Sequence, residues 1–261
     1  MPRDRPARTA IAAMAAALMG ALALTGCGSF EQERVEPGPR PDVEWRNGEP
    51  AGPLEDDPWV RRVRAADLEL KIAGVTRDFG APELYDDLYE YQYGVDPLHT
   101  YLLDLQLNAR RGAWFSPAGP APMIPIHVAV DADGQGATVT MCLATGWYVS
   151  AESPRPPADP VGTFTEQDVK ITDGRTSFAI PREIEAKHAI DMLGAGVVAP
   201  FLEGIDGPQE VEDRFEDIER SGTRRCLLDD AAIGLFTPQP DASLTYGVED
   251  IWTLSDRPPG G

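Results

Sequence analysis

The sequence predicts an α+β fold with an antiparallel sheet, because the spacing of its apolar residues changes part-way along the chain. Between Trp59 and Gly112 they recur every three or four residues, the spacing of a helical face. From Ile124 onward they alternate with polar residues, as in a strand with one buried face. Asp–Gly pairs separate the alternating runs and predict hairpins, so neighbouring strands are expected to be antiparallel.

The first expected helix begins next to Pro58, a residue that suits a first helical turn because its missing N–H is not needed there. Its apolar face has members four, three and four residues apart, namely Trp59, Val63, Ala66 and Leu70. Residues 67–72 also alternate, so a strand is an alternative for the end of this segment. Two more helices are expected, over 84–91 and, after an Asp96 cap, over 97–112.

The expected strands follow in order. Residues 124–130 and 138–143 form a hairpin about the Asp133–Gly134 turn, with one face of the second strand made by Val139, Met141 and Leu143. Residues 147–149 continue the sheet after a bulge at Gly146. Residues 164–180 form two strands about the Asp173–Gly174 turn.

The C-terminal part is expected to mix helices and strands. A helix over 182–193 ends at Gly194–Gly196, and an acidic helix follows over 208–220. A short strand over 225–228 holds Cys226, and the last strand, 246–254, carries Trp252.

The acidity of the chain excludes nucleic acid as a partner. The formal net charge is −20, and the first 26 residues contribute three Arg and one Asp, so the remainder carries about −22. Such a chain cannot bind by neutralising phosphates, and an anionic lipid surface repels it.

No catalytic residue, metal ligand or cofactor site can be assigned. GxSxG, HExxH, GxGxxG and Walker A patterns do not occur. The segment 131–134 begins like a calcium loop, but position twelve is Cys142 rather than Glu, so a hairpin turn is expected. The three histidines, His99, His127 and His188, lie far apart in sequence. Five tyrosines between 85 and 101 are interpreted as core residues, with a pocket or partner surface as the alternative.

The first 26 residues have the pattern of a secretory signal. Three arginines precede Ile11–Leu24, an uncharged apolar run of 14 residues, which is shorter than the ~20 needed to span a bilayer. The run ends in Leu24-Thr25-Gly26-Cys27, which resembles the lipobox of bacterial lipoproteins. The resemblance implies cleavage between Gly26 and Cys27 and lipidation of Cys27, which would anchor the protein on the extracytoplasmic face of the membrane. The alternative is an ordinary secretory signal with an unrelated Cys.

Residues 27–58 are expected to form a disordered tether, because they are acidic, rich in proline and poor in apolar residues. An extended chain of this length reaches at most about 90 Å. Trp45 is its candidate for docking onto a folded domain, which is expected over 59–256 and is followed by a disordered tail over 257–261.

The two remaining cysteines, Cys142 and Cys226, are a candidate disulfide. An extracytoplasmic setting permits the bond, and the spacing fits no CxxC redox or zinc pattern. A bridge would close a loop of 83 intervening residues, worth roughly 4–5 kcal/mol in the chain-entropy model. Two buried free thiols are the alternative.

The order of elements over 59–150, with the hairpin segments Val128–Asp131 and Gly136–Cys142, is similar to actinobacterial lipoproteins with NTF2-like domains. A last strand with a Trp, here Ile251–Leu254, is also similar to that family. The resemblance implies a curved antiparallel sheet wrapped by helices into an open cone. Residues 151–244 depart from it and are expected to form an additional helical insertion. No catalytic set of that superfamily transfers onto residues of this chain.

The sequence therefore predicts a lipid-anchored, non-catalytic module of the cell envelope that binds an envelope protein or a small apolar ligand. One alternative is an enzyme of ketosteroid-isomerase type, with a pocket carboxylate as base and a Tyr as hydrogen-bond donor. Another is a structural module without a ligand. An apolar cavity with a buried carboxylate beside a Tyr would favour the enzyme.

Replacing Cys27 by Ser removes the thiol to which lipid would be attached. We expect Cys27→Ser to be released into the medium or to remain unprocessed, measured by membrane fractionation and by the mass of the mature N-terminus. A mutant that stays with the membranes at mature size would contradict the anchor.

Overall fold

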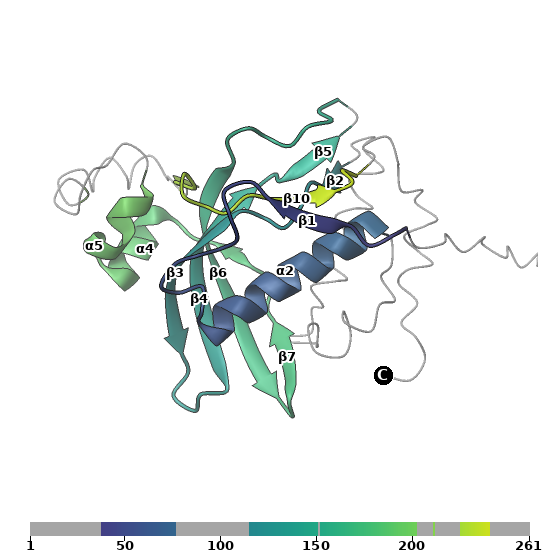
Figure 1. The fold of residues 1–261 in the computed structure, drawn as a ribbon. Helices are drawn as coiled ribbons and strands as arrows, with labels where there is room; N and C mark the ends of the chain where they lie inside the picture. Colours follow the sequence, from purple (N-terminus) through teal and green to yellow (C-terminus); the bar gives the residue numbers. More distant parts are fainter. Residues whose placement is uncertain (1–37, 77–114, 151, 203–210, 212–224, 241–261) are drawn as a thin grey trace, which may run out of the picture. The chain divides into compact units, whose positions relative to one another are not determined.

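The computed structural model describes residues 38–76, 115–150, 152–202, 211 and 225–240, all within one compact unit, Val35–Gly261 (Figure 1). These residues combine helices with antiparallel sheets, so the α+β class is confirmed. The helices expected at 84–91, 97–112 and 208–220, the last strand at 246–254 and the five clustered tyrosines lie outside the described residues, apart from Val211.

The main sheet is built around the long strand β6, Val161–Thr172. The strand β3, Met123–Val130, pairs with β4, Gly136–Thr145, and β4 pairs along its whole length with one edge of β6. Three short strands share the other edge of β6: β7 (Arg175–Phe178), β8 (Arg182–Glu183) and β9 (Arg225–Cys226).

Two short ribbons lie outside this sheet. The strand β1, Asp42–Trp45, pairs with β10, Gly234–Thr237. The strand β2, Phe115–Pro117, pairs with β5, Tyr148–Ser150. The expectation that 147–149 continues the main sheet is wrong. Gly146 has φ 72, a value that favours glycine, and β5 after it pairs with β2 instead.

The helix α2, Pro58–Thr76, begins where the sequence predicts. Asp57 Oδ1 accepts hydrogen bonds from the backbone N–H groups of Trp59, at 2.8 Å, and Val60, so Asp57 caps the helix. Trp59, Val63 and Ala66 are buried, which confirms the expected apolar face. The strand alternative for 67–72 is wrong, because the helix continues to Thr76 with its buried stripe extended by Ile72 and Ala73.

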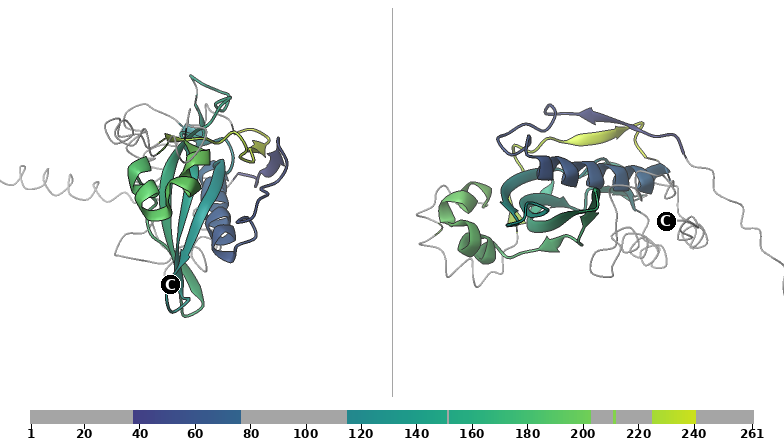
Figure 2. Two further views of the ribbon diagram at one scale, coloured as in Figure 1. Left: turned by 90° about the vertical axis from the view of Figure 1, so that its left-hand side faces the viewer. Right: turned by 90° about the horizontal axis from the view of Figure 1, so that it is seen from below.

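The main sheet separates two apolar clusters. Val139 and Met141 belong to the cluster beneath α2, and partly buried Leu143 packs against it, which confirms the face predicted for this strand. Cys142 and Phe164 belong to the cluster on the other face. That cluster also takes residues of α4 (Ala186–Leu193), α5 (Ala195–Val198) and η2 (Ala199–Phe201). Figure 2 shows α2 between the main sheet and the β1–β10 ribbon.

Both predicted Asp–Gly turns are present. Asp173 and Gly174 have φ values of 53 and 81, as a tight hairpin turn with two left-handed residues requires. Gly134 has φ 68. The unbroken alternation expected over 124–130 is wrong, because a bulge between Pro125 and His127 puts Ile126 in the cluster of Cys142, whereas Val128 packs beneath α2.

The helix expected over 182–193 begins only at Ala186. Arg182 is extended because β8 pairs with β6, and its guanidinium lies 3.3 Å from Glu166 and 3.4 Å from Asp168 on that strand. The helix ends at Gly194, φ 89, as predicted.

Residues 38–57, which the composition assigns to the tether, are part of the compact unit. Besides the β1–β10 ladder, Gly38 N–H donates to the Thr76 carbonyl at 2.7 Å, and Arg40 forms a two-pronged ion pair with Glu69. The strand β1 alternates between exposed and half-buried residues. This alternation is hard to recognise in the sequence because prolines are abundant on both sides of it. Ten residues, 28–37, separate Cys27 from the first described residue, and an extended chain of that length reaches at most about 35 Å.

The structure joins Cys142 of β4 to Cys226 of β9 by a disulfide. These strands lie on opposite edges of β6, and in a flat sheet they would be about 10 Å apart. Their Cα atoms are 5.9 Å apart, so the sheet bends sharply about β6 at this point. The bond crosses Gly162, where a Cβ atom would lie 2.4 Å from Cys142 Sγ. Gly162 therefore leaves the room that the crossing needs.

We expect Gly162→Ala to destabilise the fold by about 1–3 kcal/mol, as overpacking does, or to leave two titratable thiols. Denaturant unfolding and a thiol count on unfolded, unreduced protein measure this. Gly196→Ala is the matched control, because nothing lies within 4 Å of its added methyl group. Equal stability of the two variants, with the disulfide intact in both, would contradict the role of Gly162.

Candidate binding pocket

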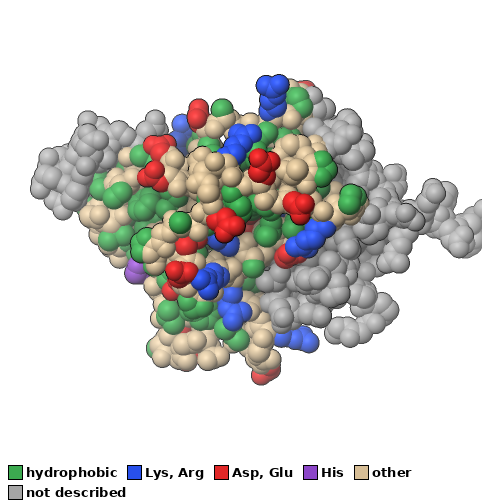
Figure 3. Space-filling model, in the orientation of Figure 1, with side chains coloured by type: hydrophobic (Ala, Val, Ile, Leu, Met, Phe, Trp, Pro, Cys, Tyr) green, Lys and Arg blue, Asp and Glu red, His purple; other side chains and the backbone are tan. Residues whose placement is uncertain are grey.

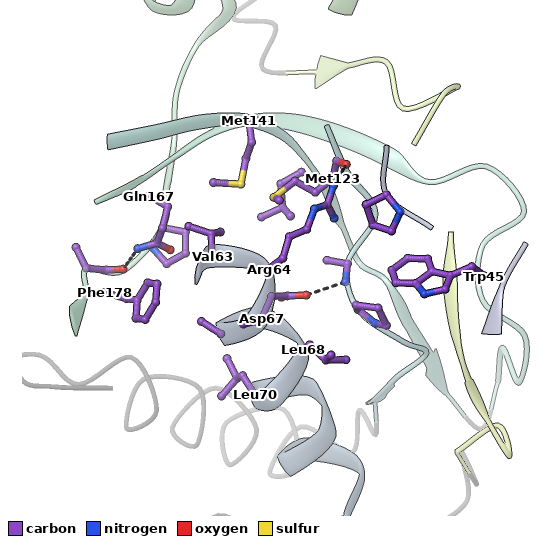
Figure 4. Close-up of a pocket in the computed structure, with 18 residues that line it drawn as sticks. Trp45, Val63, Arg64, Asp67, Leu68, Leu70, Met123, Met141, Gln167 and Phe178 are labelled. Atoms are coloured by element: carbon purple, nitrogen blue, oxygen red, sulfur yellow. Dashed lines mark hydrogen bonds between the residues drawn. The ribbon is translucent and has the colours of Figure 1, made fainter. Parts of the chain in front are cut away.

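A cavity of about 220 Å³ lies between α2 and the sheet face turned toward that helix (Figure 4). In this view Gln167 and Phe178 lie toward one end and Trp45 toward the other. The described lining is mostly apolar, with Val63, Ala66, Leu68 and Leu70 from α2, Met123, Met141, Leu143 and Phe178 from the sheet, and Trp45, Pro50, Pro120, Ala121, Ala179 and Pro181 around them.

The size of the cavity limits its occupant. An apolar cavity of about 150 Å³ takes benzene, so this one suits a ligand of roughly ten non-hydrogen atoms. Met123 and Met141 are unbranched and polarisable, which lets the wall adjust to different apolar shapes.

Figure 3 shows hydrophobic side chains scattered among charged ones on the face that carries α2 and β1.

Among the described residues, two charged side chains reach the pocket, and the protein supplies partners for both. Arg64 forms a two-pronged ion pair with Glu55, and its guanidinium donates to the Met123 carbonyl at 3.0 Å. Asp67 accepts a hydrogen bond from the Ala121 N–H at 2.8 Å and lies 3.8 Å from Lys71 Nζ. These pairs let charged residues line an apolar cavity without a bare charge facing it.

Lys71 ties α2 to β5. Its Nζ lies 3.4 Å from the Tyr148 hydroxyl oxygen and 5.3 Å from the centroid of that ring. Burial acts to lower the pKa of Lys71, but Tyr148 and Asp67 outweigh it and hold the pKa above its usual value. Lys71 is therefore a cation at neutral pH and balances Asp67.

The structure separates the site residues that the sequence singled out. Gly26 and Cys27 lie outside the described residues. Cys142 and Cys226 are bonded to each other and belong to the cluster on the sheet face opposite the pocket. They hold the fold and do not line the cavity.

The histidines do not come together. His127 and His188 are exposed on β3 and α4, and His99 lies outside the described residues. Across the described chain, no group of three or more His, Cys, Asp or Glu side chains is arranged to hold a metal ion. A membrane-crossing helix is likewise not found in the described parts.

Sequence reasoning missed the pocket, although one signal was available. On β6 the residues facing α2 are paired with the apolar face of β4, and Gln167 lies opposite Val139. A polar residue opposite the apolar face of β4 departs from the alternation of apolar and polar residues, and the sequence shows this departure. Asp67 could not be recognised, because its partner Ala121 is distant in sequence.

No protein-family model, curated protein or solved structure matches the chain.

Glu55 and Asp56 provide a matched test of the pocket wall. The Arg64–Glu55 pair is mostly buried, with side chains 18 % and 11 % exposed, whereas the Arg61–Asp56 pair is 64 % and 89 % exposed. We expect Glu55→Gln to cost about 1–3 kcal/mol of unfolding free energy, because it leaves Arg64 without its counter-charge. Asp56→Asn should change stability little. Equal effects in urea titrations would show that the Arg64 pair does not support the wall.

Proposed function

We propose that the protein is a lipid-anchored, extracytoplasmic binding module whose pocket takes a small apolar ligand without chemical conversion. The observation that carries the proposal is the apolar cavity beneath α2, in which the two charged residues of the described lining already have protein partners. A pocket of this kind gains free energy from apolar burial and offers no bare charge to a reacting group.

An NTF2-like cone is the arrangement we propose for the domain. It is supported by α2 packing across one face of an antiparallel sheet, by the bend of that sheet about β6, and by a pocket between the two. Solving the structure of residues now outside the described ranges would test it, since the cone requires helices over 77–114 to complete the wall.

The ketosteroid-isomerase alternative receives less support from the pocket. Its base would be Asp67, whose carboxylate is occupied by the Ala121 N–H and lies near the Lys71 cation. No Tyr occurs among the described residues that line the cavity, and the Tyr148 hydroxyl contacts Lys71 instead.

A lipid anchor would place the pocket near the bilayer, where apolar ligands are concentrated. Lipid on Cys27 and a connecting chain of at most about 35 Å would keep the domain close to the bilayer. Small apolar molecules concentrate in bilayers, so a tethered pocket would sample them where they are most abundant.

Methionine methyl groups offer a direct test of ligand binding. Of six methionines, Met1, Met14 and Met19 lie in the leader, so the mature chain would keep Met123, Met141 and Met192. The first two line the pocket, and Met192 is 44 % exposed on α4. We expect propylbenzene to shift the NMR signals of Met123 and Met141 in methyl-¹³C-methionine protein and to leave Met192 unchanged.

Equal shifts of all three signals would indicate non-specific association, and no shift at all would sink the proposed binding function. Met141→Leu identifies one of the two pocket signals by removing it.

A further inference from the structure

Gln167 is the polar side chain of the main sheet that lies in the pocket wall. It stands on β6 opposite Val139, and only 6 % of it is exposed. Its Nε2 donates to the Asp168 carbonyl at 3.1 Å and to the Ala179 carbonyl. Because the nitrogen must face these two carbonyl oxygens, the orientation of the amide is fixed, and Oε1 is its remaining polar atom (Figure 4).

Oε1 of Gln167 has no donor from the protein within the described parts of the chain. Oε1 is also not fully enclosed by the protein. Among described side chains, the fully enclosed polar atom without a hydrogen-bond partner is Trp147 Nε1, which lies in the cluster on the other sheet face. Arg64 and Asp67, by contrast, both have protein partners. Because Gln167 lines the pocket, Oε1 is an accessible acceptor without a protein donor, and a ligand that covers it without donating a hydrogen bond leaves it unpaired, which is costly.

We infer that Gln167 Oε1 selects apolar ligands that carry a hydrogen-bond donor, such as a phenol or alcohol hydroxyl, over hydrocarbons and ethers of the same size. This inference rests on the proposed binding function, since the pocket must take a ligand before it can choose one. Ethers, ketones and carboxylates gain nothing at Oε1, because they bring only acceptors to an acceptor. Arg64, the cation that could attract a carboxylate, is already paired with Glu55.

Three probes of nine to eleven non-hydrogen atoms suit the size of the cavity and differ chiefly in the group that they bring to Oε1. 4-Propylphenol carries a hydroxyl donor, 4-propylanisole replaces it by a methyl ether, and propylbenzene has neither group. The mature full-length chain is held in lipid nanodiscs, and affinities are taken from the Met123 and Met141 methyl signals. Empty nanodiscs correct for partition of each probe into lipid.

We expect the wild-type protein to bind 4-propylphenol about five- to tenfold more tightly than 4-propylanisole, the factor that one net hydrogen bond supplies. Gln167→Met keeps the length of the side chain and removes the acceptor, so the phenol should lose its advantage while propylbenzene still binds. Gln135→Met, in the exposed β3–β4 turn, is the matched control and should retain the advantage.

The outcomes separate the two proposals. If the three probes bind the wild-type protein equally, the selectivity is refuted and the binding function stands. If none of them shifts Met123 or Met141, both fall. A phenol advantage that survives Gln167→Met places the acceptor elsewhere and overturns the inference. Should that variant not fold, the wild-type comparison of phenol and ether still decides whether the pocket selects a donor.

Discussion

The sharp bend of the main sheet at Gly162 is the constraint on which the other parts of the structure depend. A strand pairs with one neighbour on each edge, and β6 uses one edge for β4 and divides the other among β7, β8 and β9. The bend brings Cys142 and Cys226 within bonding distance across β6. It thereby connects the early hairpin to a segment 84 residues further along the chain.

The two faces of this sheet serve different purposes. The face with the disulfide packs against α4 and α5, and its cluster includes Phe164, the aromatic residue of β6, which is fully buried. The other face meets α2 but leaves a cavity beside Met123 and Met141. The face packed against α4 and α5, with its disulfide, therefore stabilises the fold, while the face beneath α2 retains a cavity that a close-packed core would not have.

The sequence predicted those features that depend on local patterns. The start of α2 at Pro58 and its buried stripe follow from residues within a few positions of each other, as do the Asp173–Gly174 turn and the stop at Gly194. The alternation along β4 and the pairing of Cys142 with Cys226 also emerged, the second because only two cysteines remained once Cys27 was set aside.

The errors concern contacts between distant segments. The residues near Asp42–Trp45 in sequence do not indicate pairing with β10, which lies almost two hundred residues later. The proline content therefore led to the incorrect prediction of a disordered tether. The extended conformation of Arg182 depends on Glu166 across the sheet, and the bulge at Ile126 depends on pairing with β4. Apart from the polar Gln167 opposite Val139, nothing in the sequence indicates the pocket, for the same reason: its walls come from α2, four sheet strands and the Trp45 segment.

The place where the chain enters the compact unit also determines how the protein bears a mechanical load. If Cys27 carries lipid as proposed, a pull on the anchor would be resisted, among the described residues, by the Gly38–Thr76 hydrogen bond, the Arg40–Glu69 ion pair and the β1–β10 ladder. Trp45, at the end of that ladder, forms part of the pocket wall. Tension that peeled β1 away would thus open the cavity before it disturbed the disulfide-linked sheet.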